Sequence, residues 1–508
     1  LLFRLKNIIN LSNRKVSLLK KQIAKKKSWD TTIVSDNLTW EEFSKLNLFL
    51  HELQGAEPVV SVARFYTDSS SSHAIGYVSE ISANDIKSKT YLQNLNIEGV
   101  EIGKTGLESA LDEQMLGSPG YLRYEVNAYG KKIKQVATNK GLKGKTFRTT
   151  LDQSIQQVST DALQNVSGAV CVMDIYNGDI ISMVSAPNFN PNSFVHGINR
   201  DEWNALISNK DKPMLNKAVS GLYPPGSTIK TLTAISALEN DVVNSKLIIK
   251  CSGYVDLHGE RFHCWKKKGH GVVGMRTALK KSCDVYFYEV ARRLGIDRLS
   301  ATAKKFGLGQ KVLRDYREEK TGVVPSTKWK KRELGKNWYL GETLHSGIGQ
   351  GFFLTTPLQL SLMTAQIANG GFKITPRILV DVNEKVGNLE KYLNHKNLSP
   401  GNVMSTNDQI YNFNLQPLFR NQENINLVKD AMFAATNEIG GTSYKSRLED
   451  KKFMFAGKTG SSQIKRFTEE QREAETKQKD ITYFDRDHAW FVAFAPVHDP
   501  KYAISVLV

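Results

Sequence analysis

Two residues three positions apart could together perform acyl transfer in this sequence of 508 residues. Ser227 and Lys230 lie in "YPPGSTIKTLTAISALEN" (223–240). Positions i and i+3 share one face of a helix, so a neutral Lys230 could take the proton of the Ser227 hydroxyl and make it a nucleophile. The Pro-Pro-Gly at 224–226 interrupts the chain just before, so we expect a helix to begin at Ser227. Its first backbone N–H groups would then face developing negative charge.

This spacing is weak evidence by itself. Ser12, Ser17 and Ser462 also precede a lysine by three residues, and an ordinary surface helix explains most such pairs. A second segment, "KSCDVYFY", begins 54 residues after the first serine and contains Ser282 and Asp284. Alone, that stretch could hold a nucleophile with its neighbours, a metal ligand or an ordinary loop before an aromatic helix.

A third segment decides between these interpretations. "AGKTGSSQ" (456–463) contains Lys-Thr-Gly after an apolar run. The same three letters occur at 104–106, but there they precede the serine and open a helix, so we interpret that copy as a turn without a catalytic role. The ordered set S-x-x-K, S-x-(N/D) and K-T-G is characteristic of penicillin-binding proteins and serine β-lactamases. The sequence resembles that family.

The resemblance extends well beyond the three motifs. Residues 168–194 resemble the opening hairpin of the catalytic domain, "SGIGQGFFLTTPLQL" (346–360) its Gly-rich loop and following helix, and "RDHAWFVAFAP" (486–496) a neighbouring strand. Before residue 150, "LTWEE", "HAIGYVSE", "IGKTGLE" and "EVNAYGK" resemble the non-catalytic pedestal of class B members. Taken together, the chain is similar to the elongation-type class B penicillin-binding proteins over essentially its whole length.

The elements that must position these motifs indicate an α/β (α+β) fold. Residues 168–185 read as two apolar strands around Asn177-Gly178, a strong hairpin signal, and 488–508 as a hairpin turning at 498–500. Strands at both ends with helices between them predict an antiparallel sheet whose first and last strands meet, plus a helical lobe. We expect a pedestal over 1–155 and a transpeptidase domain over 156–508.

The pedestal is predicted to be mixed α/β. Residues 38–53 read as a helix with Thr39 as N-cap and glutamates in its first turn. "EPVVSVARFY" (57–66) reads as a strand, and "GLESALDEQMLG" as a short helix closed by Gly117. "EVNAYGKKIKQVA" reads as a hairpin turning at Tyr129-Gly130.

The resemblance implies a serine acyl-enzyme that cross-links peptidoglycan stem peptides during cell-wall elongation. Ser227 would attack the penultimate D-Ala carbonyl, terminal D-Ala would leave, and an amine of a neighbouring strand would take the acyl group. Lys230 would be the base, and Ser282 would relay a proton to the leaving amine. β-Lactams should acylate the same serine, and no cofactor is expected for the chemistry.

The resemblance also assigns substrate-binding residues on the Lys-Thr-Gly segment. Lys458, Thr459 and Ser461, with Gly460 between them, would hold the terminal carboxylate of the substrate through charge-assisted hydrogen bonds. The backbone N–H groups of Ser227 and Ser461 would form the oxyanion hole.

Asp284 is a departure from the broad family pattern, which has Asn here. Asn can donate to a substrate carbonyl, whereas an ionised Asp only accepts. The elongation subgroup often has Asp, so we interpret it as a mark of the subgroup; it would either donate when protonated or orient Ser282 and Lys230. In an extended loop side chains alternate, so Ser282 and Asp284 would face the cleft and Cys283 would face away.

Three of the four cysteines fall within 33 residues. Cys251, Cys264, His270 and Cys283 have the spacing C-x12-C-x5-H-x12-C, and such a set could hold a structural zinc ion. A metal centre beside this motif in elongation-type relatives strengthens that interpretation. The alternatives are a Cys251–Cys264 disulfide and plain buried thiols.

Two further histidines lie near the predicted metal ligands, and one further cysteine lies apart from them. His258 or His263 could replace His270 as the fourth ligand. Cys171 lies inside a predicted core strand, so we expect it to pack there as a small apolar side chain.

The net charge of +18 is partly local, because residues 1–29 contain nine Lys or Arg and no acidic residue. Such a run is either a solvated surface or a site for an anionic membrane or wall polymer, and we find no nucleic-acid-binding motif. No stretch of 18 apolar residues occurs. We expect the chain to be a segment of a longer product. In that product a membrane anchor would lie upstream of this segment, and a terminal helix would follow it.

The resemblance implies a place and partners as well. It predicts the periplasmic face of the bacterial inner membrane, with a SEDS-type glycan polymerase and elongation scaffold proteins as partners. Two alternatives remain open: a serine β-lactamase or D,D-carboxypeptidase, which shares the three motifs, and an inactive scaffold that activates a glycan polymerase.

Overall fold

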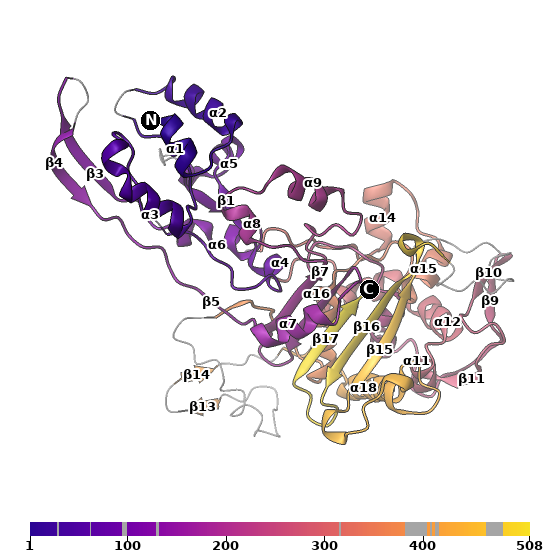
Figure 1. The fold of residues 1–508 in the computed structure, drawn as a ribbon. Helices are drawn as coiled ribbons and strands as arrows, with labels where there is room; N and C mark the ends of the chain where they lie inside the picture. The colour runs from indigo at the N-terminus through magenta and orange to yellow at the C-terminus, as the bar shows by residue number, and fades with distance from the viewer. Residues whose placement is uncertain are drawn as a thin grey trace. The chain divides into compact units, whose positions relative to one another are not determined.

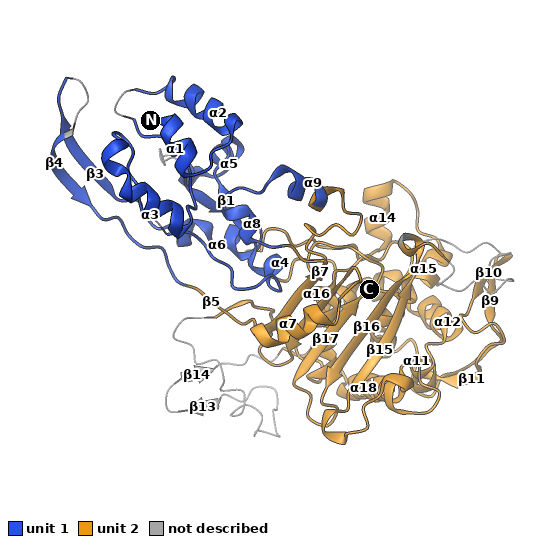
Figure 2. Ribbon diagram, viewed as in Figure 1, with its two compact units in different colours: residues 1–146, 190–205 blue, residues 147–189, 206–508 orange. Residues whose placement is uncertain are grey.

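The computed structural model describes residues 1–27, 30–60, 62–93, 99–128, 132–313, 316–380, 404–406, 409–411, 416–463 and 481–508. The chain forms two compact units (Figure 2). Unit 1 comprises residues 1–146 and 190–205, and unit 2 comprises residues 147–189 and 206–508.

Unit 1 combines short helices with two separate two-stranded antiparallel sheets (Figure 1), β1 with β2 and β3 with β4. Its helices are α1 (Leu2–Ile8), α2 (Asn13–Ile23), α3 (Trp40–Leu48), α4 (Ser72–Ile75), α5 (Ala83–Ser88), α6 (Gly106–Leu116), α8 (Asn192–Val195) and the first part of α9 (Arg200–Ser208). Its strands are β1 (Val78–Glu80), β2 (Glu101–Gly103), β3 (Tyr121–Val126) and β4 (Lys132–Asn139).

Local sequence signals account for much of unit 1. Thr39 caps α3 in a capping box with Glu42, and α6 ends at Gly117, whose φ of +70° favours glycine. The β3–β4 hairpin is confirmed; its predicted turn at 129–130 lies outside the described residues. The predicted strand at 57–66 is wrong, because its described residues pair with no strand and leave most of their apolar side chains exposed.

Unit 2 is built on a five-stranded antiparallel sheet with the strand order β15-β16-β17-β6-β7. Its strands are β6 (Gly168–Asp174), β7 (Ile180–Ala186), β15 (Ala456–Ser462), β16 (His488–Ala495) and β17 (Tyr502–Leu507). The prediction that the first and last strands meet is confirmed, because β17 pairs with β6 along its whole length. Both predicted hairpins are present, with Gly178 at φ +78° in the first turn.

Helices cover this sheet and form a lobe beside it (Figure 1). α16 packs against β6, β16 and β17, α18 against β15, and α7 against β7. The helices are α7 (Gln153–Asp161), α10 (Lys230–Glu239), α11 (Met275–Lys280), α12 (Asp284–Leu294), α13 (Ile296–Lys305), α14 (Thr327–Leu334), α15 (Leu340–Gly347), α16 (Pro357–Ala368) and α18 (Gln422–Asn437). α10 lies at the centre of the lobe, since nine of its ten residues are buried.

The described residues of unit 2 also form four small two-stranded pairs, and two of these, β8 with β11 and β9 with β10, stand beside α11 and α12. The strands are β5 (Arg148–Thr149), β8 (Ile248–Cys251), β9 (Tyr254–Leu257), β10 (Glu260–His263), β11 (Gly271–Gly274), β12 (Leu379–Val380), β13 (Met404–Thr406) and β14 (Gln409–Tyr411).

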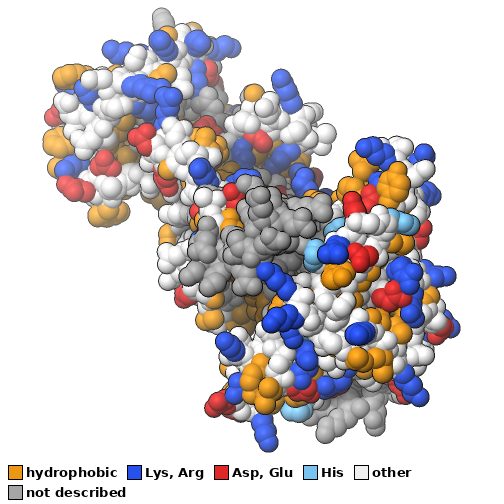
Figure 3. Space-filling model, turned by 90° about the vertical axis from the view of Figure 1, so that its right-hand side faces the viewer, with side chains coloured by type: hydrophobic (Ala, Val, Ile, Leu, Met, Phe, Trp, Pro, Cys, Tyr) orange, Lys and Arg blue, Asp and Glu red, His pale blue; other side chains and the backbone are white. Residues whose placement is uncertain are grey.

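Positive charge is spread over much of the surface. Lys and Arg side chains are scattered across the face in Figure 3, with acidic side chains among them. Charge on this face therefore does not single out one partner. Among the described residues, no helix combines the length and the apolar character needed to cross a membrane.

Candidate active site

Ser227 lies in a tight 3-10 turn, Gly226–Ile229, that leads directly into α10. The predicted helix start is therefore correct in position, but its first turn is wound more tightly than an α-helix. Gly226 has φ +55°, a conformation that favours glycine, and Thr228 Oγ1 donates to the Pro225 carbonyl at 2.7 Å. Ser227 is half-buried at the start of this turn, and Lys230 is fully buried at its end.

Two stretches of backbone approach the Ser227 turn so closely that glycines are needed or favoured at the contacts. A Cβ on Gly226 would lie 2.6 Å from the Ser461 carbonyl oxygen, and one on Gly349 would lie 2.1 Å from the Gly226 carbonyl oxygen. A Cβ on Gly460 would stand 3.0 Å from Thr228 Cγ2. The Gly-rich loop and the Lys-Thr-Gly strand thus converge on the serine.

Lys230 reaches from α10 to the segment that begins α12. Its Nζ donates to Asp284 Oδ1 at 2.6 Å, to the Ser282 carbonyl at 3.0 Å and to Ser282 Oγ at 3.2 Å. No hydrogen bond of the described residues joins Lys230 to the Ser227 hydroxyl. The predicted meeting of the first two motifs is present, with Lys230 held by the second.

Ser282 occupies a left-handed conformation, φ +53°, between α11 and α12. The expectation of an extended loop is wrong, because the residues after α11 form a turn and Cys283 is already the N-cap of α12. The side chain of Cys283 nevertheless points away from its neighbours, as expected. Ser282 and Asp284 contact Lys230, whereas Cys283 is buried in a separate cluster. A turn with positive φ, and not strand-like alternation, separates them.

Lys458 brings a second buried lysine side chain to the same serine. It lies in β15 with no exposed surface, and its Nζ donates to Ser282 Oγ at 3.0 Å and to the Thr459 carbonyl at 2.8 Å. Burial, reinforced by the charge of Lys230, holds the pKa of Lys458 well below its ordinary value. Ser282 Oγ thus lies between two lysines.

Both oxygens of the Asp284 carboxylate accept hydrogen bonds from the protein. Oδ1 accepts from Lys230, and Oδ2 accepts from the backbone N–H of Trp265 at 2.9 Å. An ionised carboxylate suits two donors. Of the two roles expected for Asp284, the geometry fits the orienting one.

The remaining residues of the Lys-Thr-Gly segment lie further out along β15. Thr459 Oγ1 donates to Thr442 Oγ1 at 3.0 Å, and the exposed Ser461 accepts at its carbonyl from Gln350 Nε2 at 3.0 Å. The loop that carries Thr442 is tied to α11, since the Thr442 N–H donates to the Lys280 carbonyl. Neither residue was predicted to contact this segment: Gln350 lies in the Gly-rich loop at 346–360, but no role was assigned to it, and no motif marks Thr442.

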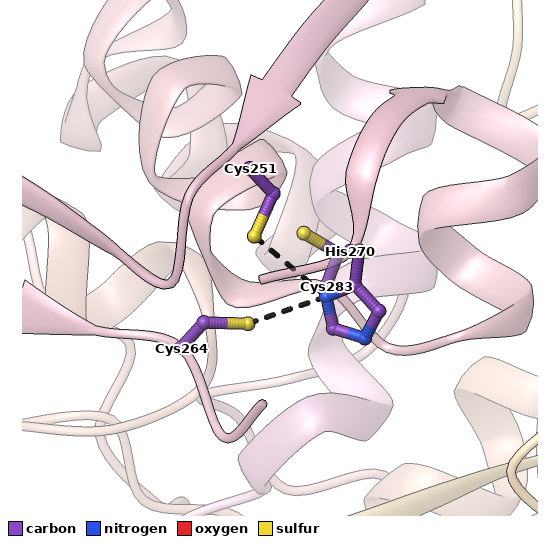
Figure 4. Close-up of side chains that lie close together, drawn as sticks. All are labelled: Cys251, Cys264, His270 and Cys283. Atoms are coloured by element: carbon purple, nitrogen blue, oxygen red, sulfur yellow. Dashed lines mark hydrogen bonds between the residues drawn. The ribbon is translucent and has the colours of Figure 1, made fainter. Parts of the chain in front are cut away.

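The four predicted metal ligands converge at a second, buried site. Figure 4 shows Cys251, Cys264, His270 and Cys283 with their side chains directed toward one another, and their ligand atoms all lie within 4.8 Å. His270 Nδ1 lies 3.7 Å from Cys251 Sγ and 3.5 Å from Cys264 Sγ. All four cysteines of the chain are free, so no disulfide joins Cys251 to Cys264.

The thiols of this cluster differ in acidity. A hydrogen bond with Cys283 lowers the pKa of Cys264 to about 5. The same hydrogen bond and burial raise the pKa of Cys283. Cys171 stands apart in β6, where burial raises its pKa to about 12, in keeping with the expected packing role.

The arrangement of serines and lysines agrees with the comparison to known families. Residues 168–508 match the penicillin-binding protein transpeptidase domain. The chain belongs to the penicillin-binding protein transpeptidase family. Residues 1–149 match the penicillin-binding protein dimerisation domain.

Named relatives of this transpeptidase cover nearly all of the chain. The peptidoglycan D,D-transpeptidase MrdA of Acinetobacter baumannii is 32% identical over 511 residues, which are 99% of this chain and 71% of that protein. The solved complex between penicillin-binding protein 2 and MreC from Helicobacter pylori matches with a TM-score of 0.80 at 28% identity, covering 100% of this chain and 86% of that chain.

A further solved match is a peptidoglycan synthase complex that coordinates polymerization and crosslinking. It has a TM-score of 0.68 at 26% identity and covers 97% of this chain and 81% of that chain. The fold of a penicillin-binding protein 2, with a transpeptidase domain following a dimerisation domain, therefore extends over both units of the chain.

Proposed function

We propose that this chain is a peptidoglycan D,D-transpeptidase that works through an acyl-enzyme on Ser227. The observation that carries the proposal is the placement of two buried lysines, Lys230 and Lys458, on one serine, Ser282, in the transpeptidase unit. Such a chain of hydrogen bonds can pass a proton between a nucleophile and a leaving group. The relatives named peptidoglycan D,D-transpeptidase support the same reaction.

Acylation begins when Ser227 Oγ attacks the carbonyl carbon of the penultimate D-Ala of a stem peptide. A neutral Lys230 takes the hydroxyl proton as the O–C bond forms. The C–N bond to the terminal D-Ala then breaks, and the leaving amine takes a proton through Ser282. The hydrogen bonds from Lys230 and Lys458 to Ser282 Oγ provide this route.

Deacylation repeats these steps with a different amine. An amino group of a neighbouring strand attacks the acyl carbon, the O–C bond to Ser227 breaks, and the proton returns to the serine. A new amide bond replaces the one that was broken, so no external energy source is needed. A β-lactam acylates the same oxygen by opening its ring.

Asp284 acts as an ionised anchor in this scheme. Because Lys230 and the Trp265 N–H occupy its two oxygens, it has no proton to donate to substrate. Its role is to hold the Lys230 ammonium group near Ser282 between proton transfers.

The substrate binds along β15. Thr459 and Ser461, on the open side of the strand, hold the terminal carboxylate, with Gly460 giving the backbone room beside Thr228. Lys458 stands on the other side of the strand, where its Nζ donates to Ser282 Oγ. The N–H groups of Ser227 and Ser461 stabilise the oxyanion, where one donor is typically worth about 3 kcal/mol. The close approach of Gly226 to Ser461 supports this pairing.

The cluster of three thiols and an imidazole fits a structural zinc ion. Three sulfurs and one nitrogen within 4.8 Å form the donor set of closed tetrahedral sites. Cys251, Cys264, His270 and Cys283 would hold the ion, which would fix the strands beside α12 and take no part in the reaction. Elemental analysis tests this: one zinc per chain is expected, and less than a tenth of that in Cys264→Ala.

The proposed setting is the periplasmic side of the inner membrane, with the pedestal over 1–155 and the catalytic domain over 156–508. The relative solved with MreC and the relative in a synthase complex support an elongation scaffold protein and a glycan polymerase of the SEDS type as partners. Stem peptides and β-lactams are the ligands of the catalytic domain.

Mass spectrometry after penicillin treatment tests the proposed function. A covalent adduct on Ser227 that persists for minutes or longer is expected, and Ser227→Ala should show none. Rapid loss of the adduct would favour a β-lactamase or carboxypeptidase. A folded protein without any adduct would favour an inactive scaffold.

A further inference from the structure

Trp265 makes three hydrogen bonds to the segment that carries Ser282 and Asp284. Its backbone N–H donates to Asp284 Oδ2 at 2.9 Å. Its indole Nε1–H donates to the Ser282 carbonyl at 3.0 Å and to the Lys281 carbonyl at 3.2 Å. One residue outside the three motifs therefore holds both polar members of the second motif.

Lys230, at the start of α10, donates to the same carbonyl and the same carboxylate group as Trp265. Its Nζ donates to the Ser282 carbonyl and to the other oxygen of Asp284. The carbonyl and the carboxylate are each shared between Lys230 and Trp265. Without the Trp265 donors, Lys230 would be the only side chain that donates to the Ser282 carbonyl or the Asp284 carboxylate among the hydrogen bonds of the described residues.

The Ser282 turn needs such support. A non-glycine residue at φ +53° is held in a sparsely populated conformation that its surroundings must stabilise. The carbonyl that accepts from the indole belongs to this strained residue. A donor at that carbonyl fixes the direction in which the Ser282 side chain points.

Burial does not explain the Trp265 side chain, because 61% of it is exposed. Its ring contacts a member of the thiol cluster instead: the indole and the His270 ring meet edge to face with centroids 5.2 Å apart. Trp265 also follows Cys264 directly in the chain. The side chain therefore bridges the cluster and the catalytic serine turn.

We propose that Trp265 is a positioning residue that fixes Ser282 and Asp284 against Lys230 and ties them to the Cys251, Cys264, His270 and Cys283 cluster. The inference rests on the proposed function, because it gives Ser282 and Lys230 their roles in acylation. It predicts that loss of the indole N–H slows acylation without weakening penicillin binding.

The sharpest test replaces Trp265 with its benzothienyl isostere, which has sulfur in place of the indole N–H. The rate constant for acylation by a fluorescent penicillin should fall about three- to tenfold, the loss expected for one hydrogen bond. The half-saturation concentration and the melting temperature should stay unchanged. Trp265→Phe should act similarly, and Trp40→Phe, an exposed tryptophan of unit 1, should have no effect.

Two outcomes would overturn the inference. Acylation of the isostere at the wild-type rate would show that the indole N–H positions nothing, and a parallel loss of melting temperature would show a merely structural role. Absence of any adduct in the wild-type chain would instead overturn the proposed function. The experiment therefore distinguishes failure of the Trp265 proposal from failure of the proposed function.

The tie to the cluster has its own readout. His270→Ala should slow acylation in the wild-type background more than in the isostere background, because residues that act through one another show non-additive effects. Strictly additive effects of the two changes on the acylation rate constant would overturn that part of the proposal.

Discussion

The tetrapeptide Gly-Lys-Thr-Gly occurs once in each unit, and its two copies do different things. At 103–106 it joins β2 to α6, and Lys104 Nζ forms an ion pair with Asp85 at 2.5 Å. At 457–460 it lies within β15, and Lys458 is fully buried with its Nζ on Ser282 Oγ. The residues around a lysine, and not the motif letters, decide whether it can take part in proton transfer.

The glycines of the two copies differ for the same reason. Gly106 has φ +59°, and a Cβ there would lie 2.7 Å from the backbone of Ile75, so the turn itself demands glycine. Gly460 has no such torsion; a Cβ there would press on the Ser227 turn, 3.0 Å from Thr228 Cγ2. One glycine serves the fold of unit 1, and the other leaves room for the Ser227 turn.

The largest expected contrast comes from removing each lysine. Lys458→Ala should slow acylation by a fluorescent penicillin about a hundredfold or more, because groups that take part in proton transfer contribute roughly 10²–10⁴ in rate. Lys104→Ala should leave the acylation rate unchanged and lower only the stability of unit 1. Equal effects of the two substitutions on acylation would refute the contrast.

The next contrast is between two aspartates that each bind a lysine: Asp284, which binds Lys230 in unit 2, and Asp85, which binds Lys104 in unit 1. Asp284→Asn would turn an amide N–H₂ toward either Lys230 or the Trp265 N–H, since both are donors. Loss of a charge-assisted hydrogen bond of about 1.5–3 kcal/mol should slow acylation roughly 10- to 100-fold. Stopped-flow acylation kinetics would measure this, and an Asn variant as fast as wild type would show that Asp284 does not hold Lys230.

The matched change in unit 1 is Asp85→Asn. Asp85 pairs with Lys104 and also forms the capping box of α5 with Ser82. We expect a loss of about 1–2 kcal/mol in unfolding free energy and an unchanged acylation rate. Chemical denaturation and the same kinetic assay distinguish the two results.

The two copies should also titrate in different pH ranges. Burial lowers the pKa of Lys458 well below its ordinary value of 10.5, so between those pKa values the unfolded chain binds more protons and stability rises with pH. Burial opposes but does not outweigh the hydrogen bonds from Lys104 and Ser82, which hold the pKa of Asp85 at about 2 against 3.8. That contribution is present above pH 3.8 and is lost as the pH falls toward 2.

Denaturation at both ends of the pH scale checks this difference. Lys458→Met should lose the rise in stability on the alkaline side, and Asp85→Asn should lose part of the fall on the acidic side. An unchanged alkaline slope in Lys458→Met would mean that Lys458 keeps its proton in the folded chain.

The contrast also shows what the sequence could predict. The order of the three motifs favoured Lys458 over Lys104, and the structure places Lys458 on Ser282. The turn residues at 177–178 and 498–500 were enough to place two hairpins of the sheet. The partner of Lys104 was not predicted, because a contact between residues 85 and 104 depends on how β2 and α5 pack. The positive φ of Ser282 also escaped prediction, since nothing in "KSCD" distinguishes a strained turn from an extended loop.

Long-range packing accounts for the other differences. The apolar stretch at 57–66 predicted a strand, but no partner strand pairs with the described residues there. Nothing local indicates that 190–205 packs with unit 1, where Asn192 exchanges hydrogen bonds with the backbone of Tyr66. The pairing of the first and last strands of the sheet was predicted correctly, whereas these contacts of residues 57–66 and 190–205 were not.

The smallest expected contrast concerns the threonines of the two copies. Thr459 Oγ1 donates to Thr442 Oγ1 at 3.0 Å, whereas the Thr105 side chain makes no capping hydrogen bond at the start of α6. Thr442→Val keeps the shape but removes the acceptor, so Thr459 loses the bond that fixes its hydroxyl. The half-saturation concentration for penicillin should rise about two- to tenfold, with little change in the acylation rate constant.

Thr442→Ser restores the hydroxyl and should restore the wild-type value, while Thr105→Val should leave both kinetic constants unchanged. A titration of acylation rate against penicillin concentration separates the two constants. If Thr442→Val instead lowers the rate constant alone, then Thr459 acts on the reacting groups and not on the bound carboxylate. Thr459 would then belong with Lys458 to the catalytic residues of β15, and not to the residues that bind the carboxylate.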